Sequence, residues 1–311
     1  MSAIEQVIDG RTKDLGGFQV SRVLPWARRR MVGPFVFLDE MGPAVFPPGQ
    51  GVDVRPHPHI GLATVTYLFD GEMHHFDSLG SDQTVHPGDV NLMVAGRGIS
   101  HSERTREEVR ARGYSLHGIQ TWIALPEADE SVEPSFHHHP KADLPEFEHG
   151  GAALRLILGE AYGQRAPVKT FSGIVYIHAE MAPGARFDLP EGHDALAVYL
   201  VSGEAEVGGQ RIEPGQLAVL NDGETAEMRS GAGGRAMILG GQDIGKRFIE
   251  WNFVASSKEL IEKAKTDWRA SAAGRWQGTV FILPPGEQEY IPLPGDPEEG
   301  PPEPSKECPT T

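Results

Sequence analysis

Glycine and proline divide this chain into many short apolar runs, and that division limits it to a small group of folds. Residues 35–38, 63–69 and 90–94 are such runs, and turn signals such as Asp70-Gly71 and Pro87-Gly88-Asp89 separate them. The chain holds 38 glycines and 25 prolines in 311 residues, more than a helical protein would tolerate. Short strands at regular spacing are typical of β-sandwiches and β-barrels, so we predict an all-β fold.

The order of these runs occurs twice. Residues 67–72 precede a proline–glycine turn at 86–89, and residues 199–204 precede a similar turn at 213–216. Each set begins with an aromatic-led strand and a glycine turn. We therefore expect an internal duplication, with one barrel in each half of a chain long enough for two cores.

Composition changes at two places and predicts the domain limits. Residues 127–149 carry acids, prolines and the run His137-His138-His139, which is typical of a linker. We expect an N-terminal domain over 1–135, a C-terminal domain over 136–283, and a solvated, flexible tail over 284–311 that is rich in Pro, Glu and Gly. A short C-terminal helix is expected from Ser256, with Glu259 three residues on as a capping box and apolar residues following at helical spacing.

Charge and cysteine content narrow the partners and the compartment. The net charge of −16 argues against nucleic acid or an anionic membrane as a direct ligand. Cys308 is the single cysteine, so no disulfide framework is expected. We see no secretory signal and no apolar run near the ~20 residues of a membrane span. A cytoplasmic protein is the expectation.

Metal-binding side chains concentrate in the first half. His57-Pro58-His59 precedes the run at 63–69, and His101-Ser102-Glu103 follows the run at 90–94. Residues two apart on an extended segment point to the same face, so each pair can converge on one point inside a barrel. Three imidazoles and a carboxylate suit Fe(II), Mn(II), Ni(II), Co(II) or Zn(II), and a six-coordinate ion would keep two positions open.

The other histidines receive a structural interpretation. His74 and His75 follow a turn and are expected in a hairpin, and the histidine run at 137–139 is assigned to the linker. His117, His178 and His193 have no same-face partner nearby. The second half contains no His-x-His motif, so its barrel is expected to be metal-free.

Three segments resemble the pirin family closely: residues 55–61, with the His-Pro-His motif, Pro87-Gly88-Asp89, and residues 95–103, with the His-x-Glu motif. The similarity also includes residues 33–39, Gln120-Thr121-Trp122 and residues 251–254. It implies a fold of two tandem cupin (jelly-roll-type) barrels with iron in the first only. The ligands it implies are His57, His59, His101 and Glu103. Many other cupins place a glutamate four residues after the His-x-His pair, where this chain has Ala63.

The resemblance also suggests what the site does. Some members of the pirin family, which this chain resembles, act as quercetin 2,3-dioxygenases. The resemblance therefore implies a flavonol or similar small aromatic substrate and Glu103 as catalytic base. It also implies Fe(II) as the metal, with Mn, Ni, Co, Cu or Zn as alternatives. Other pirins are iron-dependent regulators without enzymatic activity that bind a transcription factor or metabolic enzyme, and this stays as the alternative. A sugar-phosphate isomerase is a third, weaker option, because no basic cluster accompanies the histidines. The family resemblance implies a monomer.

Overall fold

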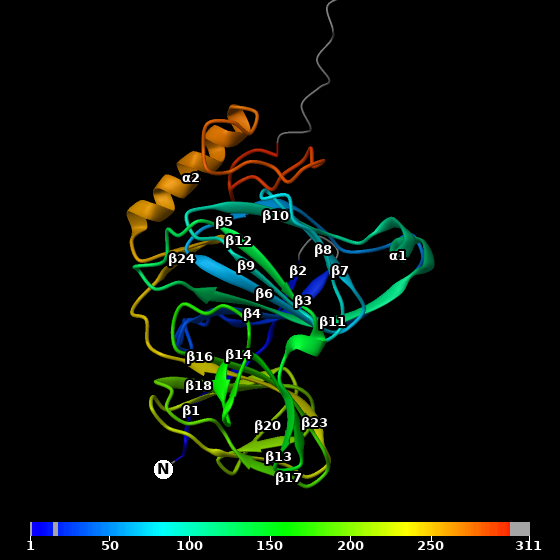
Figure 1. The fold of residues 1–311 in the computed structure, drawn as a ribbon, viewed down its shortest axis with the longest axis vertical. Coiled ribbons are helices and arrows are strands. Elements are labelled where there is room, and N and C mark those ends of the chain that lie inside the picture. Colours follow the sequence, from blue (N-terminus) through cyan, green and yellow to red (C-terminus); the bar gives the residue numbers. More distant parts are fainter. Residues whose placement is uncertain (1, 15–17, 299–311) are drawn as a thin grey trace, which may run out of the picture.

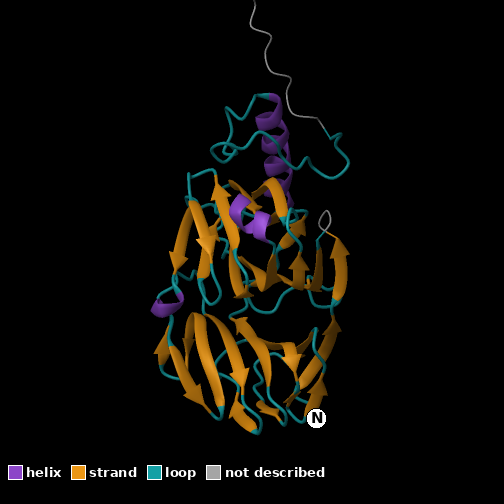
Figure 2. Ribbon diagram, turned by 90° about the vertical axis from the view of Figure 1, so that its right-hand side faces the viewer, coloured by secondary structure: helices purple, strands orange, loops and turns teal. Residues whose placement is uncertain are grey.

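Two β-barrels lie one above the other along the long axis of the molecule (Figure 1). This computed structural model describes residues 2–14 and 18–298. Each barrel consists of a large and a small antiparallel sheet, and the large sheets of the two barrels face each other. The predicted all-β fold with two tandem cupin barrels is confirmed (Figure 2). No helix in the described ranges is both long and apolar enough to cross a membrane.

The first barrel carries the metal-binding motifs. Its large sheet has the order β12 (Ser135–His139), β9 (Val90–Val94), β6 (Leu62–Asp70), β11 (Tyr114–Ala124), β4 (Phe35–Phe46), β3 (Gln19–Leu24) and β2 (Arg11–Asp14). Its small sheet has the order β5 (Asp53–His59), β10 (Ile99–Arg104), β7 (Met73–Asp77) and β8 (Asp82–Val85). Helix α1 (Glu107–Arg112) connects β10 to β11.

The second barrel repeats this topology. Its large sheet runs β1 (Ile4–Asp9), β21 (Gln216–Leu220), β18 (Ala195–Gly203), β23 (Gly234–Gly241), β16 (Ile174–Met181), β14 (Ala152–Ala161) and β13 (Glu146–His149), with β15 (Gln164–Arg165) paired to β14. Its small sheet runs β17 (Ala185–Asp188), β22 (Glu227–Ser230), β19 (Ala205–Val207) and β20 (Gln210–Ile212). The matching strand orders support the predicted duplication.

Two edge strands do not follow the expected division of the chain into domains. β1 belongs to the sheet of the second barrel, where it pairs with β21. β12 pairs with β9 of the first barrel, and the expected domain division between residues 135 and 136 falls inside it. The prediction that His137–His139 lie in a linker was wrong, since these residues are in β12. Strand addition at these edges satisfies backbone groups that would otherwise stay unpaired. The short 3₁₀ helix η1 (Lys141–Asp143) then leads into the second barrel.

The largest apolar cluster lies between the barrels. Val65 and Leu92 from the first large sheet and Ala197 and Leu239 from the second are among its fully buried members. A polar group is also buried there: the Tyr67 hydroxyl accepts a hydrogen bond from Arg155 at 3.0 Å and contacts Nδ1 of His178 at 2.8 Å. Burial of this extent fixes the two barrels as one unit.

The chain after the second barrel returns to the first. It forms the hairpin β24 (Phe248–Glu250) and β25 (Phe253–Ala255), helix α2 (Lys258–Ala273), and an extended strap over residues 279–298. These segments pack around Trp268, which is 1% exposed, at the end of the molecule nearest β5 and β10 (Figure 1). The helix cap is Ser257, one residue later than predicted, because Ser256 bonds Glu130 instead.

The first part of the predicted solvated tail, residues 284–298, is packed against the protein. Leu293 is buried against the cluster around Trp268, and the Trp268 indole donates to the carbonyl of Ile291 at 3.1 Å. Residues 284–298 are therefore part of the packed structure, because their few apolar side chains complete a small core that the helix cannot close alone. The remainder of the expected tail, 299–311, lies outside the described residues.

Candidate metal centre

Neighbouring antiparallel strands β5 and β10 bring the two predicted motifs together. His101 of β10 stands opposite His57 of β5, and Ile99 stands opposite His59. The register shifts between His101 and Glu103, so β5 carries an extra residue at this point. Such bulges redirect side chains and are frequent beside functional sites. The alternation that the sequence predicted places His101 and Glu103 on one face of the strand, facing the barrel interior.

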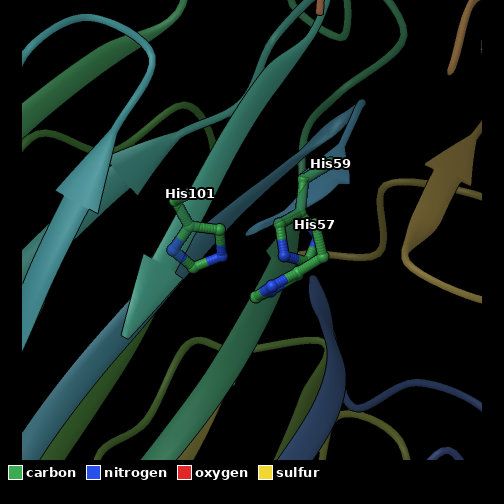
Figure 3. Close-up of side chains that lie close together, drawn as sticks. All are labelled: His57, His59 and His101. Carbon is green, nitrogen blue, oxygen red and sulfur yellow. The ribbon is translucent and has the colours of Figure 1, made fainter. Parts of the chain in front are cut away.

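The three histidines form a compact, buried cluster (Figure 3). One nitrogen from each of His57, His59 and His101 lies within 4.8 Å of the other two. The ring centroids are 5.0 Å apart for His57 and His59 and 4.3 Å apart for His57 and His101. Their exposures are 8%, 1% and 1% in chain order, so the nitrogens converge in a nearly closed space. Three imidazole nitrogens that converge in this way form a candidate metal site.

Two of the imidazoles are oriented by backbone carbonyls. Nδ1 of His57 lies 2.9 Å from the carbonyl oxygen of Arg55, and Nδ1 of His59 lies 2.9 Å from that of Asn252. A carbonyl oxygen can only accept, so Nδ1 carries the proton in each ring. Nε2 is then left with its lone pair, which is the form a metal requires.

Burial also disfavours the charged form of two of the three rings, those of His59 and His101. It lowers the pKa of His59 and of His101 well below the usual histidine value, and the neighbouring imidazoles lower both further. A neutral imidazole can bind a cation without first losing a proton. Nε2 of His101 is buried without a hydrogen-bond partner among the described residues, which leaves it available as a ligand atom.

Glu103 lies beside the cluster but is not among its three members. Its Oε1 accepts a hydrogen bond from Nε2 of Gln120 at 3.3 Å and lies 3.5 Å from Nδ1 of His101. Its Oε2 is buried and has no partner in the described chain. A buried carboxylate oxygen without a donor is costly, and a bound cation would satisfy it. The residues present therefore fit a divalent metal.

Sequence reasoning missed the role of His75. The prediction that His75 lies in a hairpin is confirmed, since it belongs to β7–β8, but this residue also borders the site. Its Nδ1 lies 3.4 Å from Nδ1 of His101, its Nε2 bonds Asp77 at 3.0 Å, and its ring stacks on Phe136. Residues 75 and 77 share a strand face, and that spacing was the available signal.

In the sequence, Gln120 and Trp122 are distinguished only by their resemblance to a family pattern. The structure places both on the inner face of β11. The Trp122 ring lies nearly perpendicular to the His59 ring, with 5.0 Å between the ring centroids, and it stacks on Phe37 at 4.0 Å. The metal centre is therefore bordered by an apolar aromatic ring, Trp122, and by the polar side chain of Gln120.

The outer face of β10 is covered by the strap. Ser102 donates to Glu287 at 2.7 Å, and Arg104 makes two hydrogen bonds to the same carboxylate. These residues alternate with His101 and Glu103, so one strand is held on its outside while its inside forms the site. Arg104 and Glu287 are both partly buried, which strengthens this ion pair relative to a fully exposed one.

The second barrel fills the corresponding positions with other side chains. β17 and β22 take the places of β5 and β10 in the strand order, and their inward residues are Ala185, Phe187, Met228 and Ser230. Its interior cluster is apolar. His178 instead bonds Tyr67 and Glu180 at the barrel interface, so it does have partners, although not a same-face histidine.

Comparison with known proteins agrees with these features. The family model described as Pirin matches residues 17–123, and the one described as Pirin C-terminal cupin domain matches residues 176–274. A pirin-like protein of Caulobacter vibrioides is 49% identical over 94% of this chain and 99% of its own length. Human pirin is 30% identical over 83% of this chain and 89% of its own.

A solved structure supports the same assignment. The crystal structure of a quercetin 2,3-dioxygenase from Acinetobacter baumannii superposes with a TM-score of 0.85 at 32% identity. The superposition covers 95% of this chain and 96% of that one. The fold and the two-barrel arrangement are therefore shared along almost the whole length of both chains.

Proposed function

This chain belongs to the pirin family, and from that premise we propose that it is a metal-dependent dioxygenase that opens the heterocyclic ring of a flavonol. The observation that carries the proposal is the buried three-histidine cluster with the unpaired Oε2 of Glu103 beside it. The similarity to a structure named quercetin 2,3-dioxygenase supports the reaction type. The small aromatic substrate we propose is quercetin or a close relative.

We propose His57, His59, His101 and Glu103 as the ligands of one divalent ion. Iron(II) is the metal we expect in the cell, with Mn, Ni, Co, Cu or Zn as the alternatives that the same donors accept. Three neutral imidazoles and one carboxylate leave a net positive site, which suits an anionic oxygen ligand such as a flavonolate. When bound, the ion would supply Lewis-acid chemistry and a template that holds substrate and dioxygen together.

The protein residues then divide the remaining work. Glu103 is also the proposed base: once its Oε2 has been released from the ion, that oxygen accepts the proton of the flavonol hydroxyl, while Gln120 holds Oε1. Trp122, stacked on Phe37, offers a flat apolar surface beside His59 for the substrate rings. The reaction takes up one dioxygen and releases one carbon as carbon monoxide, so it needs no other oxidant.

The test combines metal analysis with turnover. Protein purified without a histidine tag is analysed for metal, loaded anaerobically with Fe(II), and given quercetin in an oxygen-uptake cell with carbon monoxide detection. We expect one metal per chain and equal amounts of oxygen consumed and carbon monoxide released. His59→Ala is the control, which should lose both. Full metal loading without carbon monoxide would refute the dioxygenase.

One observation favours the alternative, a non-enzymatic iron-dependent regulator. His59 and His101 are each only 1% exposed, so a three-ring substrate must displace neighbouring side chains to reach them. A closed site suits an ion that senses redox state and changes a protein-binding surface. Loaded protein that is inactive on quercetin, but whose binding to a cytoplasmic transcription factor or metabolic enzyme depends on iron oxidation state, would support this role.

A further inference from the structure

The hairpin β24–β25 packs against the first barrel next to His59, although it follows the second barrel in the sequence. Ile60 forms a parallel bridge with Phe253, and the backbone N–H of Val254 donates to the carbonyl of Ile60 at 3.2 Å. Ile60 and Phe253 are both buried in the cluster around Trp268. The residue next to a proposed ligand is thus packed against this hairpin.

The turn of the hairpin supplies the hydrogen bond that orients His59. The carbonyl oxygen of Asn252 lies 2.9 Å from Nδ1 of His59, and 193 residues separate the two in the chain. His57 makes the same kind of bond to Arg55 on its own strand. The orientation of one ligand is therefore local, whereas that of the other depends on a segment outside the first barrel.

Buried polar contacts fix the hairpin at both ends. Before it, the guanidinium of Arg247 donates twice to the carbonyl of Leu125 at 3.1 Å. After it, the backbone N–H and the hydroxyl of Ser256 donate to Glu130 at 2.7 and 2.6 Å. Arg247 and Glu130 are 5% and 7% exposed. Charge-assisted bonds of this kind hold a turn in place more firmly than surface contacts do.

The hairpin also approaches the first barrel as closely as backbone permits. Gly61 has a φ of +65°, and a Cβ atom there would collide with the carbonyl oxygen of Val254. Only glycine combines this backbone conformation with such an approach. The sequence His59-Ile60-Gly61 is thus fitted to the hairpin at each of its three positions.

We propose that the hairpin β24–β25 is a positioning element of the metal centre, which fixes the ring of His59 with Nδ1 protonated and Nε2 directed to the other two histidines. This inference rests on the proposed metal-binding function, and it assigns a role to residues 251–254, whose similarity to the family had no explanation. Carbonyl groups that orient ligand histidines typically contribute about 10–100-fold to metal affinity.

Two variants displace the hairpin without touching a ligand. Gly61→Ala pushes Val254 away, and Glu130→Gln removes one of the two acceptors of Ser256. The matched controls are Gly80→Ala and Glu133→Gln. Gly80 has a φ of +90° with no atom near its Cβ position, and Glu133 is an exposed carboxylate paired with Arg97. If Gly61→Ala does not fold, Glu130→Gln decides.

Two measurements separate this inference from the function on which it rests. The first is the affinity for Co(II) by chelator competition, with the visible spectrum of the bound ion. We expect each test variant to bind about 10–100-fold more weakly with an altered spectrum, and each control to stay within about twofold. Equal affinities and spectra in all variants would overturn the inference.

The second measurement is the imidazole ¹H–¹⁵N NMR spectrum of the metal-free protein. We expect His59 to carry its proton on Nδ1 in the wild type and to lose this single tautomer in both test variants, while His57 stays unchanged as an internal control. An unchanged His59 tautomer would refute the positioning role. Failure of the wild type to bind any metal would refute the proposed function, and the NMR result would still decide about the hairpin.

Discussion

Replacing Glu103 by glutamine should stabilise the metal-free protein against unfolding and destabilise the metal-loaded protein. Glu103 is 5% exposed, and its Oε2 has no hydrogen-bond donor among the described residues. Leaving a buried acceptor unsatisfied costs about 1–3 kcal/mol, and more when the group is charged. Glutamine keeps the shape and the bond from Gln120 but removes the charge. The metal-free variant should therefore be about 1 kcal/mol more stable than the wild type.

The loaded protein should respond in the other direction. If the Glu103 carboxylate is a ligand of the bound ion, replacing it lowers the affinity for the metal by about tenfold or more. This corresponds to a loss of about 1.4 kcal/mol or more from the stability that metal binding adds. Urea unfolding at fixed pH, without metal and with Co(II) in excess, measures both values on the same samples.

Glu40→Gln provides a matched control. Glu40 is 7% exposed in the same barrel, but His117 donates to its Oε1 at 2.8 Å and Tyr199 donates to its Oε2 at 2.5 Å. Because both oxygens are satisfied, this substitution should destabilise the protein by about 1–3 kcal/mol with or without metal. If Glu103→Gln destabilises the metal-free protein as much as Glu40→Gln does, the reasoning about an uncompensated carboxylate is refuted.

The remaining predictions concern the ligand set, the barrel interface and the strap. His59→Ala should lower the metal content well below one ion per chain in elemental analysis, and full retention would remove His59 from the ligand set. Burial lowers the pKa of His178 below that of an unfolded histidine, despite the opposing hydrogen bond to Glu180. As the pH falls, His178 is therefore protonated in the unfolded chain before it is protonated in the folded protein. The contribution of His178 to the free energy of unfolding is thus complete above about pH 6.5 and decreases below it. His178→Gln should reduce the difference between urea midpoints at about pH 7.5 and about pH 5.5, and an unchanged difference would contradict this. Leu293→Ala should destabilise by about 2 kcal/mol in urea unfolding followed by tryptophan fluorescence, whereas a loose tail would show no change.

The sequence predicted the strands and the ligand candidates because both depend on short-range geometry. The period of two along a strand places His57 with His59, and His101 with Glu103, whatever surrounds them. Turn residues mark where strands end, so the repeated order of strands in each half was visible before any contact was known.

Long-range pairing decided what the sequence left open. β1 joins the second barrel and β12 the first because an exposed sheet edge accepts whichever strand the chain can deliver there, and composition does not encode that choice. The segment at 284–298 has the composition of a solvated tail, yet its few apolar residues are buried around Trp268.

The sequence by itself therefore determined the fold class, the duplication and the identity of the candidate ligands, since each follows from local spacing and residue chemistry. Tertiary structure alone decided how the site is held. The carbonyl of Asn252 on His59, the carboxylate of Glu287 behind β10 and the ring of His75 beside His101 all come from other segments of the chain. Backbone carbonyls have no sequence signature, because every residue carries one, and only the fold brings a particular one to a particular ring.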